Sequence, residues 1–286
     1  MKVLITGHKG FVGRYFWEKL DTVENQLHGI DKSEGNDCRK YFETFEDSYD
    51  LVIHLAAVVG GRETIEGRPL AVADNFAIDS AFFQWCIKTK PKKVVYFSSS
   101  ACYPIEYQKE GQQRLLREDM IDLNSIRNPD LTYGWSKLVG EYLGSFLDNV
   151  FVFRPFSGYG TDQDLNYPFP MYIKRAMEKS TPFEVWGPGT QTRDFIHIRD
   201  IVEAVLLSVE LEVKGPVNLG WARATSFVDL AEQVSKQNGY SPPIVTRPDK
   251  PIGCMHRVSD NSKLLEFYTP KITLEEGIFM AQKGIR

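Results

Sequence analysis

The first 155 residues alternate between short apolar runs and longer segments of mixed polarity. The short runs are rich in Val, Ile, Leu and aromatic side chains and have the length of buried strands. An order in which such runs alternate with helical segments predicts a parallel sheet with helices on both faces. The expected strands are residues 2–6, 26–30, 51–55, 93–98 and 150–153, and the expected helices are residues 14–20, residues 75–88 and the segment around Tyr133.

The pattern changes after Pro155. Residues 159–170 are rich in Gly, Asp, Asn and Pro, which predicts a loop, and helices and short strands mix beyond it. We therefore expect an α/β fold with a doubly wound parallel sheet formed by residues 1–155, to which residues 195–220 return. The rest of residues 156–286 is expected to be mainly a smaller, substrate-binding part, because ligands of open α/β sheets bind at the open ends of the strands.

A glycine-rich turn joins the first strand to the first helix. Gly7, Gly10 and Gly13 follow residues 2–6 directly, with the spacing G-x-x-G-x-x-G. A strand, a glycine turn and a helix in this order are the context of a dinucleotide-binding site, in which the pyrophosphate lies at the positive end of the helix. We therefore interpret the first domain as Rossmann-like.

An acidic residue, Asp31, ends the second strand. This is the position at which a carboxylate binds the ribose 2′-hydroxyl of a dinucleotide, and its charge would repel the 2′-phosphate of NADP. The sequence thus favours NAD. NADP is the less favoured alternative, since Lys9 or Lys32 could reach a 2′-phosphate.

Tyr133 and Lys137 are four residues apart on an expected helix, so they lie on the same face. A lysine cation beside a phenol favours the phenolate and lowers a pKa that is ordinarily about 10. We therefore predict that Tyr133 acts as an acid and base near neutral pH.

Composition narrows the class of protein. The chain has 286 residues, 42% of them apolar and 25% charged, with a net charge of −4, which gives no support for nucleic-acid binding. No apolar run reaches membrane-spanning length, and the first strand leaves no room for a signal peptide, so we expect a cytoplasmic protein without membrane contact. The four cysteines are scattered, which argues against a metal site.

Together these segments resemble the extended short-chain dehydrogenase/reductases, and among them the NAD-dependent sugar-nucleotide epimerase/dehydratase family. The resemblance implies that Tyr133 is the acid/base and that Lys137 binds the nicotinamide ribose. It also implies that a serine hydrogen-bonds the reacting sugar hydroxyl; Ser99 is favoured and Ser100 stays open. The matching pieces are residues 7–13, Asp31, residues 54–57, the serines before Tyr103, Tyr133 with Lys137, residues 154–155 and residues 186–200.

The same resemblance implies the rest of the site. Arg193 and Arg257 correspond to arginines that bind the nucleotide diphosphate, although an ion pair with Asp260 is an alternative role for Arg257. Asn75 would brace the helix beneath the cofactor, and Asp37 would contact the adenine. The expected cofactor contacts are Gly7, Lys9, Gly10, Phe11, Val12, Gly13, Asp31, Lys32, Asp37, Leu55, Ala56, Ala57, Asn75 and Lys137.

The residues after the serine cluster separate the possible reactions. Dehydratases of the family carry Asp-Glu there and decarboxylating members a nearby Glu, whereas this chain has Ala101 and Cys102. Cys102 resembles the cysteine with which GDP-mannose 3,5-epimerases and GDP-fucose synthases deprotonate a sugar carbon. It stays a candidate substrate contact, with a buried, inert thiol as the alternative.

We therefore predict an NAD-dependent epimerase that acts on a nucleotide-diphosphate sugar through a transient keto sugar, with C4 as the reacting carbon. The alternative is an NAD(P)H-dependent reductase of a 4-keto sugar nucleotide. A non-catalytic NAD-binding protein is the third interpretation, and Tyr133 with Lys137 argues against it.

A homodimer is also expected. The helices at residues 75–88 and 133–147 carry apolar side chains on more than one face, as in the four-helix dimer interface of this family. Burial within one subunit is the competing explanation. The side chains concerned are Phe82, Phe83, Trp85, Leu138, Tyr142 and Phe146.

Overall fold

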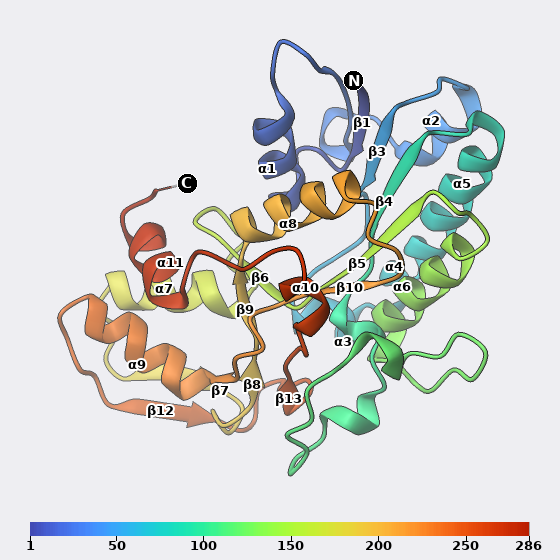
Figure 1. The fold of residues 1–286 in the computed structure, drawn as a ribbon. Coiled ribbons are helices and arrows are strands. Elements are labelled where there is room, and N and C mark those ends of the chain that lie inside the picture. The colour runs from blue at the N-terminus through green and yellow to red at the C-terminus, as the bar shows by residue number, and fades with distance from the viewer. Residues whose placement is uncertain (286) are drawn as a thin grey trace.

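The computed structural model describes residues 1–285 and centres on a parallel sheet of six strands (Figure 1). The strand order is β10-β5-β4-β3-β1-β2, so the chain moves outward from β1 in one direction and then in the other. This reversal beside β1 is where ligands of doubly wound sheets bind. The strands are β1 (Lys2–Thr6), β2 (Gln26–Ile30), β3 (Leu51–His54), β4 (Lys93–Phe97), β5 (Val150–Pro155) and β10 (Val217–Leu219).

Helices cover both faces of the sheet, because successive side chains of each strand point to opposite sides. Val3 and Ile5 pack toward α1 (Phe11–Leu20) and α8 (Ile198–Glu210). Leu4 packs toward the opposite face, against α2 (Cys38–Thr44) and α5 (Asp74–Thr89), and α6 (Leu131–Gly144) lies beside α5 (Figure 1). The strands are therefore buried on both faces, and the predicted α/β class and doubly wound sheet are confirmed.

Short helical turns follow the carboxyl ends of the strands and form the loops of the candidate site. The last two of these turns lie in the stretch before Tyr133 that was expected to be irregular. In chain order, the turns and their bounds are η1 (Lys32–Glu34), α3 (Arg62–Gly67), α4 (Pro69–Val72), η2 (Ser100–Cys102), η3 (Ile105–Gln108) and η4 (Glu118–Met120).

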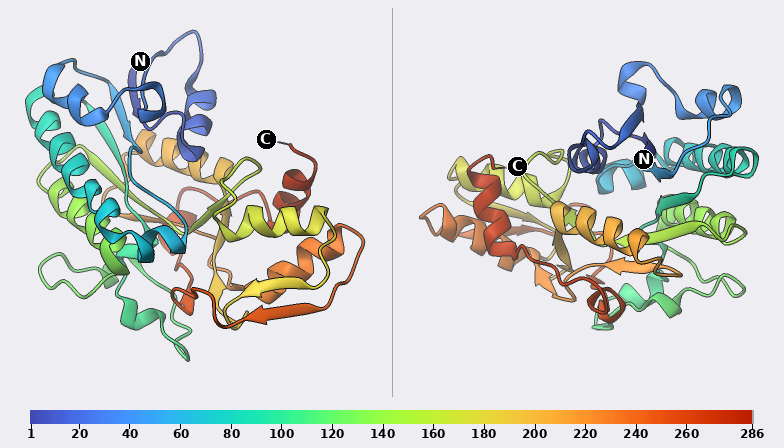
Figure 2. Two further views of the ribbon diagram at one scale, coloured as in Figure 1. Left: turned by 180° about the vertical axis from the view of Figure 1, so that it is seen from behind. Right: turned by 45° about the horizontal axis from the view of Figure 1, so that its top comes forward.

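The C-terminal part has a core of its own, formed where α7, α9 and α11 pack together at the end of the molecule away from α5 and α6 (Figure 2). One strand of this part, β12, pairs with β7 as a two-stranded sheet. The elements are β6 (Ser157–Tyr159), α7 (Pro168–Met177), β7 (Phe183–Trp186), β8 (Thr192–Arg193), β9 (Phe195–His197), β11 (Thr225–Ser226), α9 (Phe227–Gln237), β12 (Ile244–Arg247), β13 (His256–Arg257), α10 (Ser262–Leu265) and α11 (Leu274–Gln282).

Elements beyond residue 155 also join the first part: α8 packs on the sheet, β10 pairs with β5, and Leu264 of α10 belongs to the same core. The division of the chain into a cofactor part and a substrate part stays a prediction. Within the described residues, the structure has no helix with the length and apolar character needed to cross a membrane.

Four of the six side chains expected at a dimer surface are instead part of the monomer core. Phe82, Phe83, Trp85 and Leu138 are almost completely buried, because α5 and α6 pack against the sheet and against each other. This corrects their assignment to an interface. The other two, Tyr142 on α6 and Phe146 just beyond its end, are exposed and touch each other edge to face.

Candidate active site

The glycine turn is packed too closely to hold side chains. Gly7 has a φ of +75°, and a Cβ built there would lie 2.9 Å from the Ala56 nitrogen. A Cβ on Gly13 would lie 2.2 Å from the Gly7 carbonyl oxygen, well inside contact distance. Gly10 precedes α1 without a side-chain cap, so the first N–H groups of this helix are open to an anion. These features fit a dinucleotide pyrophosphate.

Asp31 lies beside this turn with its carboxylate held in place. It accepts hydrogen bonds from the Lys9 backbone N–H at 3.0 Å and from the Ser33 N–H at 2.9 Å. Burial acts to raise the pKa of Asp31, but these hydrogen bonds outweigh it and hold the pKa below its usual value. The carboxylate is thus ionised at neutral pH, which fits the predicted preference for NAD. The Lys9 ammonium pairs with Glu34 at 3.2 Å.

Two other predicted cofactor residues have defined structural partners. Asn75 is fully buried and bonds both the N–H and the carbonyl of Val58, so it fixes the loop after β3. The Asp37 carboxylate caps α2 and pairs with Arg39 at 2.6 Å, which also lowers its pKa to about 2. Its acceptor oxygens are therefore already engaged, which weakens the interpretation of Asp37 as an adenine contact.

Tyr133 and Lys137 lie on α6 as the sequence indicated, but the pKa of the tyrosine differs from the expectation. Burial raises the pKa of Tyr133, with further increases from Tyr167 and Cys102, while a hydrogen bond with Ser99 lowers it. The predicted lowering by Lys137 is therefore not seen, because burial of the phenol dominates. The side chain of Lys137 is itself almost fully buried.

The two candidate serines differ in position. Ser99 is half-buried, caps η2 by accepting a hydrogen bond from the Ala101 N–H at 3.1 Å, and lies near enough to Tyr133 to lower the pKa of its phenol. Ser100 is buried. The geometry therefore favours Ser99 as the partner of Tyr133.

Cys102 is enclosed by protein. Its sulfur lies 3.2 Å from the Ser98 hydroxyl oxygen, only 1% of the residue is exposed, and burial raises the pKa of the thiol to about 12. A thiol in this state is a poor base and cannot contact a ligand. These features favour the inert thiol over the acid/base role.

Arginines from distant parts of the chain gather around Asp130, the residue before α6. The guanidinium groups of Arg62 and Arg257 donate to its carboxylate at 2.8 and 2.7 Å. Arg257 does not pair with Asp260, so this alternative is wrong; Asp260 instead accepts hydrogen bonds from Ser262. One buried carboxylate thus faces several guanidinium groups.

Arg193 is the third member of this arginine cluster. It donates to the carbonyl oxygens of Thr192 and Cys254, at 2.8 and 2.9 Å. Burial lowers the pKa of Arg193, and the positive charges of Arg257 and Arg62 lower it further. A Cβ on Gly253 would lie 3.2 Å from Arg62 Nε and 3.4 Å from Arg193 Nη2, so the two side chains meet there. The cluster has the excess positive charge and planar donors that a diphosphate requires.

The sequence reasoning missed Arg62. This arginine starts α3, directly after the paired glycines that follow β3. Its place after a central parallel strand was the available signal, since the carboxyl ends of such strands meet at one edge of the sheet.

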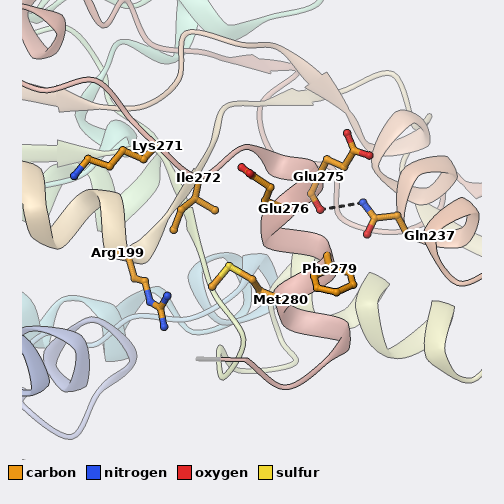
Figure 3. Close-up of a pocket in the computed structure, with 8 residues that line it drawn as sticks. All are labelled: Arg199, Gln237, Lys271, Ile272, Glu275, Glu276, Phe279 and Met280. Atoms are coloured by element: carbon orange, nitrogen blue, oxygen red, sulfur yellow. Dashed lines mark hydrogen bonds between the residues drawn. The ribbon is translucent and has the colours of Figure 1, made fainter.

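A hollow of about 690 Å³ lies elsewhere, between the start of α8, the end of α9 and α11 (Figure 3). None of the predicted site residues lines it. Its lining residues are Arg199, Gln237, Lys271, Ile272, Glu275, Glu276, Phe279 and Met280.

Comparison with known proteins agrees with this geometry. Residues 3–220 match the profile of the NAD dependent epimerase/dehydratase family. A dTDP-4-dehydro-6-deoxy-D-allose reductase of Streptomyces sp is 27% identical, covering 92% of this chain and 89% of that protein.

Two crystal structures share the fold. The UDP-glucose 4-epimerase of Thermus thermophilus, in complex with NAD, has a TM-score of 0.83 at 19% identity, covering 100% of this chain and 99% of that one. The UDP-glucuronic acid 4-epimerase of Bacillus cereus, with UDP-glucuronic acid and NAD, has a TM-score of 0.80 at 25% identity, with 100% and 99% covered. The family match confirms the resemblance: the chain belongs to the NAD dependent epimerase/dehydratase family and is an NAD-dependent enzyme.

Proposed function

We propose that this protein is an epimerase of a nucleotide-diphosphate sugar, which acts through a transient keto sugar at C4. One observation carries the proposal. Tyr133 stands beside Ser99 and one helical turn before the buried Lys137, on the helix whose preceding residue, Asp130, is bound by the arginine cluster. A site for proton transfer from a sugar hydroxyl is thereby joined to a site for a diphosphate.

The glycine turn and its neighbours would hold the cofactor. The backbone of Gly7, Gly10 and Gly13 with the start of α1 suits the pyrophosphate, and Asp31 suits the adenosine ribose. Leu55, Ala56 and Ala57 follow β3 at the same edge, and Lys137 would bind the nicotinamide ribose. NAD would supply the hydride acceptor and donor for the sugar carbon. The pocket must let the keto sugar turn between the two transfers, so that hydride returns to its other face.

Tyr133 would remove the proton of the sugar hydroxyl, with Ser99 hydrogen-bonded to the same oxygen. For this the phenol must lose its proton, and the burial that raises its pKa opposes that loss. The charges of Lys137 and of an oxidised nicotinamide would both favour the phenolate. The residues that follow Ser99 and Ser100 provide no pair of carboxyl groups, which disfavours dehydration.

The diphosphate would lie against Arg62, Arg193 and Arg257. A diphosphate competes with Asp130 for two of these guanidinium groups, because both anions offer oxygens in a geometry that suits the guanidinium fork. The part of the chain from residue 156 onward would mainly cover the sugar. Two solved neighbours are described as 4-epimerases of UDP-sugars, which supports C4 as the reacting carbon.

A second candidate is a reductase of a 4-keto sugar nucleotide, which is supported by the 27% identity to the Streptomyces enzyme. It would use Tyr133, Lys137 and Ser99 in the same way, with hydride drawn from free NADH or NADPH. We also propose a cytoplasmic homodimer. The exposed Tyr142 on α6, Phe146 just beyond this helix and Ile87 on α5 support its interface.

Product analysis by NMR tests the proposal. The protein is incubated with UDP-, GDP-, dTDP- and CDP-hexoses and their 4-keto forms, with and without NAD(P)H. An isomer of the substrate, formed without added reductant, is the expected result. Consumption of one reduced cofactor per product would replace the epimerase by the reductase, and no conversion of any substrate would contradict both.

A further inference from the structure

A chain of buried polar side chains runs behind Lys137, from α6 to the start of the cofactor site. Tyr96 donates its phenol proton to Asp79 Oδ2 at 2.5 Å, and Asp79 Oδ1 lies 3.3 Å from His54 Nε2. His54 Nδ1 lies 2.8 Å from the Thr6 hydroxyl oxygen. All four side chains are at most 1% exposed.

The direction of each hydrogen bond follows from the acceptors. The Thr6 oxygen accepts from the backbone N–H groups of Leu55 and Ala56, each at 3.2 Å, so its own proton must go to His54 Nδ1. The proton of a neutral His54 is then on Nε2 and points at Asp79. Burial lowers the pKa of His54, in agreement with a neutral ring.

Asp79 is therefore an acceptor on both oxygens and stays ionised. Burial acts to raise its pKa, but Lys137 first, then His54 and Tyr96, hold the pKa below its usual value. Within the described part of the chain, the ion-pair contacts of Asp79 contain no Lys or Arg. The other buried carboxylate nearby, Glu141, is paired with Arg154 at 2.6 Å.

Lys137 lies next to this chain. Its Nζ is 5.0 Å from the centroid of the Tyr96 ring, whose hydroxyl group is the one bound to Asp79. Gly140, three residues further along α6, leaves the room for this contact: a Cβ there would lie 1.8 Å from the Tyr96 oxygen and 2.8 Å from Asp79 Oδ2. The helix is thus fitted closely against the tyrosine–carboxylate pair.

We propose that Asp79 is a positioning residue, which holds the buried Lys137 in place through Tyr96 and supplies a counter-charge to its ammonium group. The same chain, through His54 and Thr6, orients the backbone amides of Leu55 and Ala56. This inference rests on the proposed role of Lys137. This series of hydrogen bonds ends beside Lys137 on one side and at the amides of Leu55 and Ala56 on the other. Both ends are places where the cofactor would bind.

Other titratable groups face this network from the neighbouring elements. After burial and Asp79, Cys102 of η2 and Glu141 of α6 further raise the pKa of Tyr96. After burial, Tyr167, which precedes α7, raises the pKa of Tyr133. Glu141 is already paired with Arg154, whereas the carboxylate of Asp79 interacts with the charge of Lys137.

The first experiment is an NMR titration of the lysine ¹³Cε signals, with Lys137 assigned by its loss in Lys137→Met. In Asp79→Asn the titration midpoint of Lys137 should fall by about one pH unit or more, since an opposite charge is lost. Asp200→Asn removes another buried carboxylate, one that is bonded to Tyr268 and to the backbone of residues 271 and 272, and should leave the midpoint in place. An unchanged midpoint in Asp79→Asn would overturn the proposal.

A thermal-unfolding cycle covers the case in which Asp79→Asn folds poorly. A counter-ion is needed only while its cation is present, so Asp79→Asn should lower Tm much less in the Lys137→Met background than in the wild type. Equal decreases in both backgrounds would also overturn the proposal. Neither experiment needs turnover, so failure of the epimerase assay leaves this result standing, and a failed titration does not touch the epimerase.

Discussion

The two sides proposed for the candidate site, one for the cofactor and one for the substrate, are built in different ways. The cofactor side is made of backbone: a glycine turn within seven residues, an open helix end and one carboxylate at the end of the adjacent strand. The substrate side is made of long side chains, Arg62, Arg193 and Arg257, which come from far apart in the chain and gather around one carboxylate. The first is fixed by local packing, whereas the second depends on the whole fold and on a balance of charge.

Tyr133→Phe gives the largest expected effect and separates chemistry from both binding sides. Removal of the phenol group should reduce turnover by about 10²–10⁴-fold, the usual contribution of general acid–base catalysis. The affinities for NAD and for nucleoside diphosphates should stay near those of the wild type. Steady-state kinetics and calorimetric titration measure the two quantities, and undiminished turnover would remove Tyr133 from the mechanism.

Gly13→Ala should damage the cofactor side. The new Cβ would meet the Gly7 carbonyl oxygen at 2.2 Å, and such overpacking costs about 1–3 kcal/mol of the free energy of unfolding. We expect NAD affinity to fall by about tenfold or more while UDP or GDP still binds. Gly67→Ala is the matched control, because a Cβ there meets nothing within 4 Å. Equal NAD affinity in the two variants would contradict this account of the turn.

Arg193→Gln should damage the substrate side. The loss of one charged donor is expected to weaken UDP or GDP binding by about tenfold to a hundredfold and to leave NAD binding unchanged. Arg62→Gln should have a smaller effect, because Arg62 also pairs with Glu66. Calorimetry at two salt concentrations measures both. If Arg62→Gln left nucleotide affinity unchanged, Arg62 would be a structural residue of α3 alone.

Asp130→Asn tests the charge balance of the substrate side through the pH dependence of stability. Burial acts to raise the pKa of Asp130, but Arg257 and Arg62 lower it to about 2. The resulting stability, about 2 kcal/mol, is fully present above the unfolded pKa of about 3.9 and is lost as the pH falls through about 2. Urea unfolding between pH 5 and pH 2 should therefore be less pH-dependent in the variant. A parallel pH dependence in both proteins would exclude Asp130 as the source.

What could be predicted from the sequence follows the same division. Gly7, Gly13 and Asp31 are recognisable because strand, turn and helix are adjacent in the chain, and Tyr133 with Lys137 because helical spacing is local. Contacts between distant segments could not be predicted from the sequence.

Through-space contacts account for what was missed. The pairing of Arg62 with Asp130 joins residues 68 positions apart, and the chain from Thr6 to Asp79 crosses two strands and a helix. Burial also reversed two inferences: Phe82, which looked like interface, is core, and the pKa of Tyr133 rises where helical spacing predicted a fall.

Asp130 stands immediately before the helix that carries Tyr133, and two arginines hold it there. An anion that engaged those arginines would weaken their hold on the start of this helix when the substrate arrives. The nucleotide, which takes no part in bond making, would then set the readiness of the tyrosine. A free sugar of the right shape would then bind without being turned over. The protein would recognise its substrate by the nucleotide diphosphate before it reacts with the sugar.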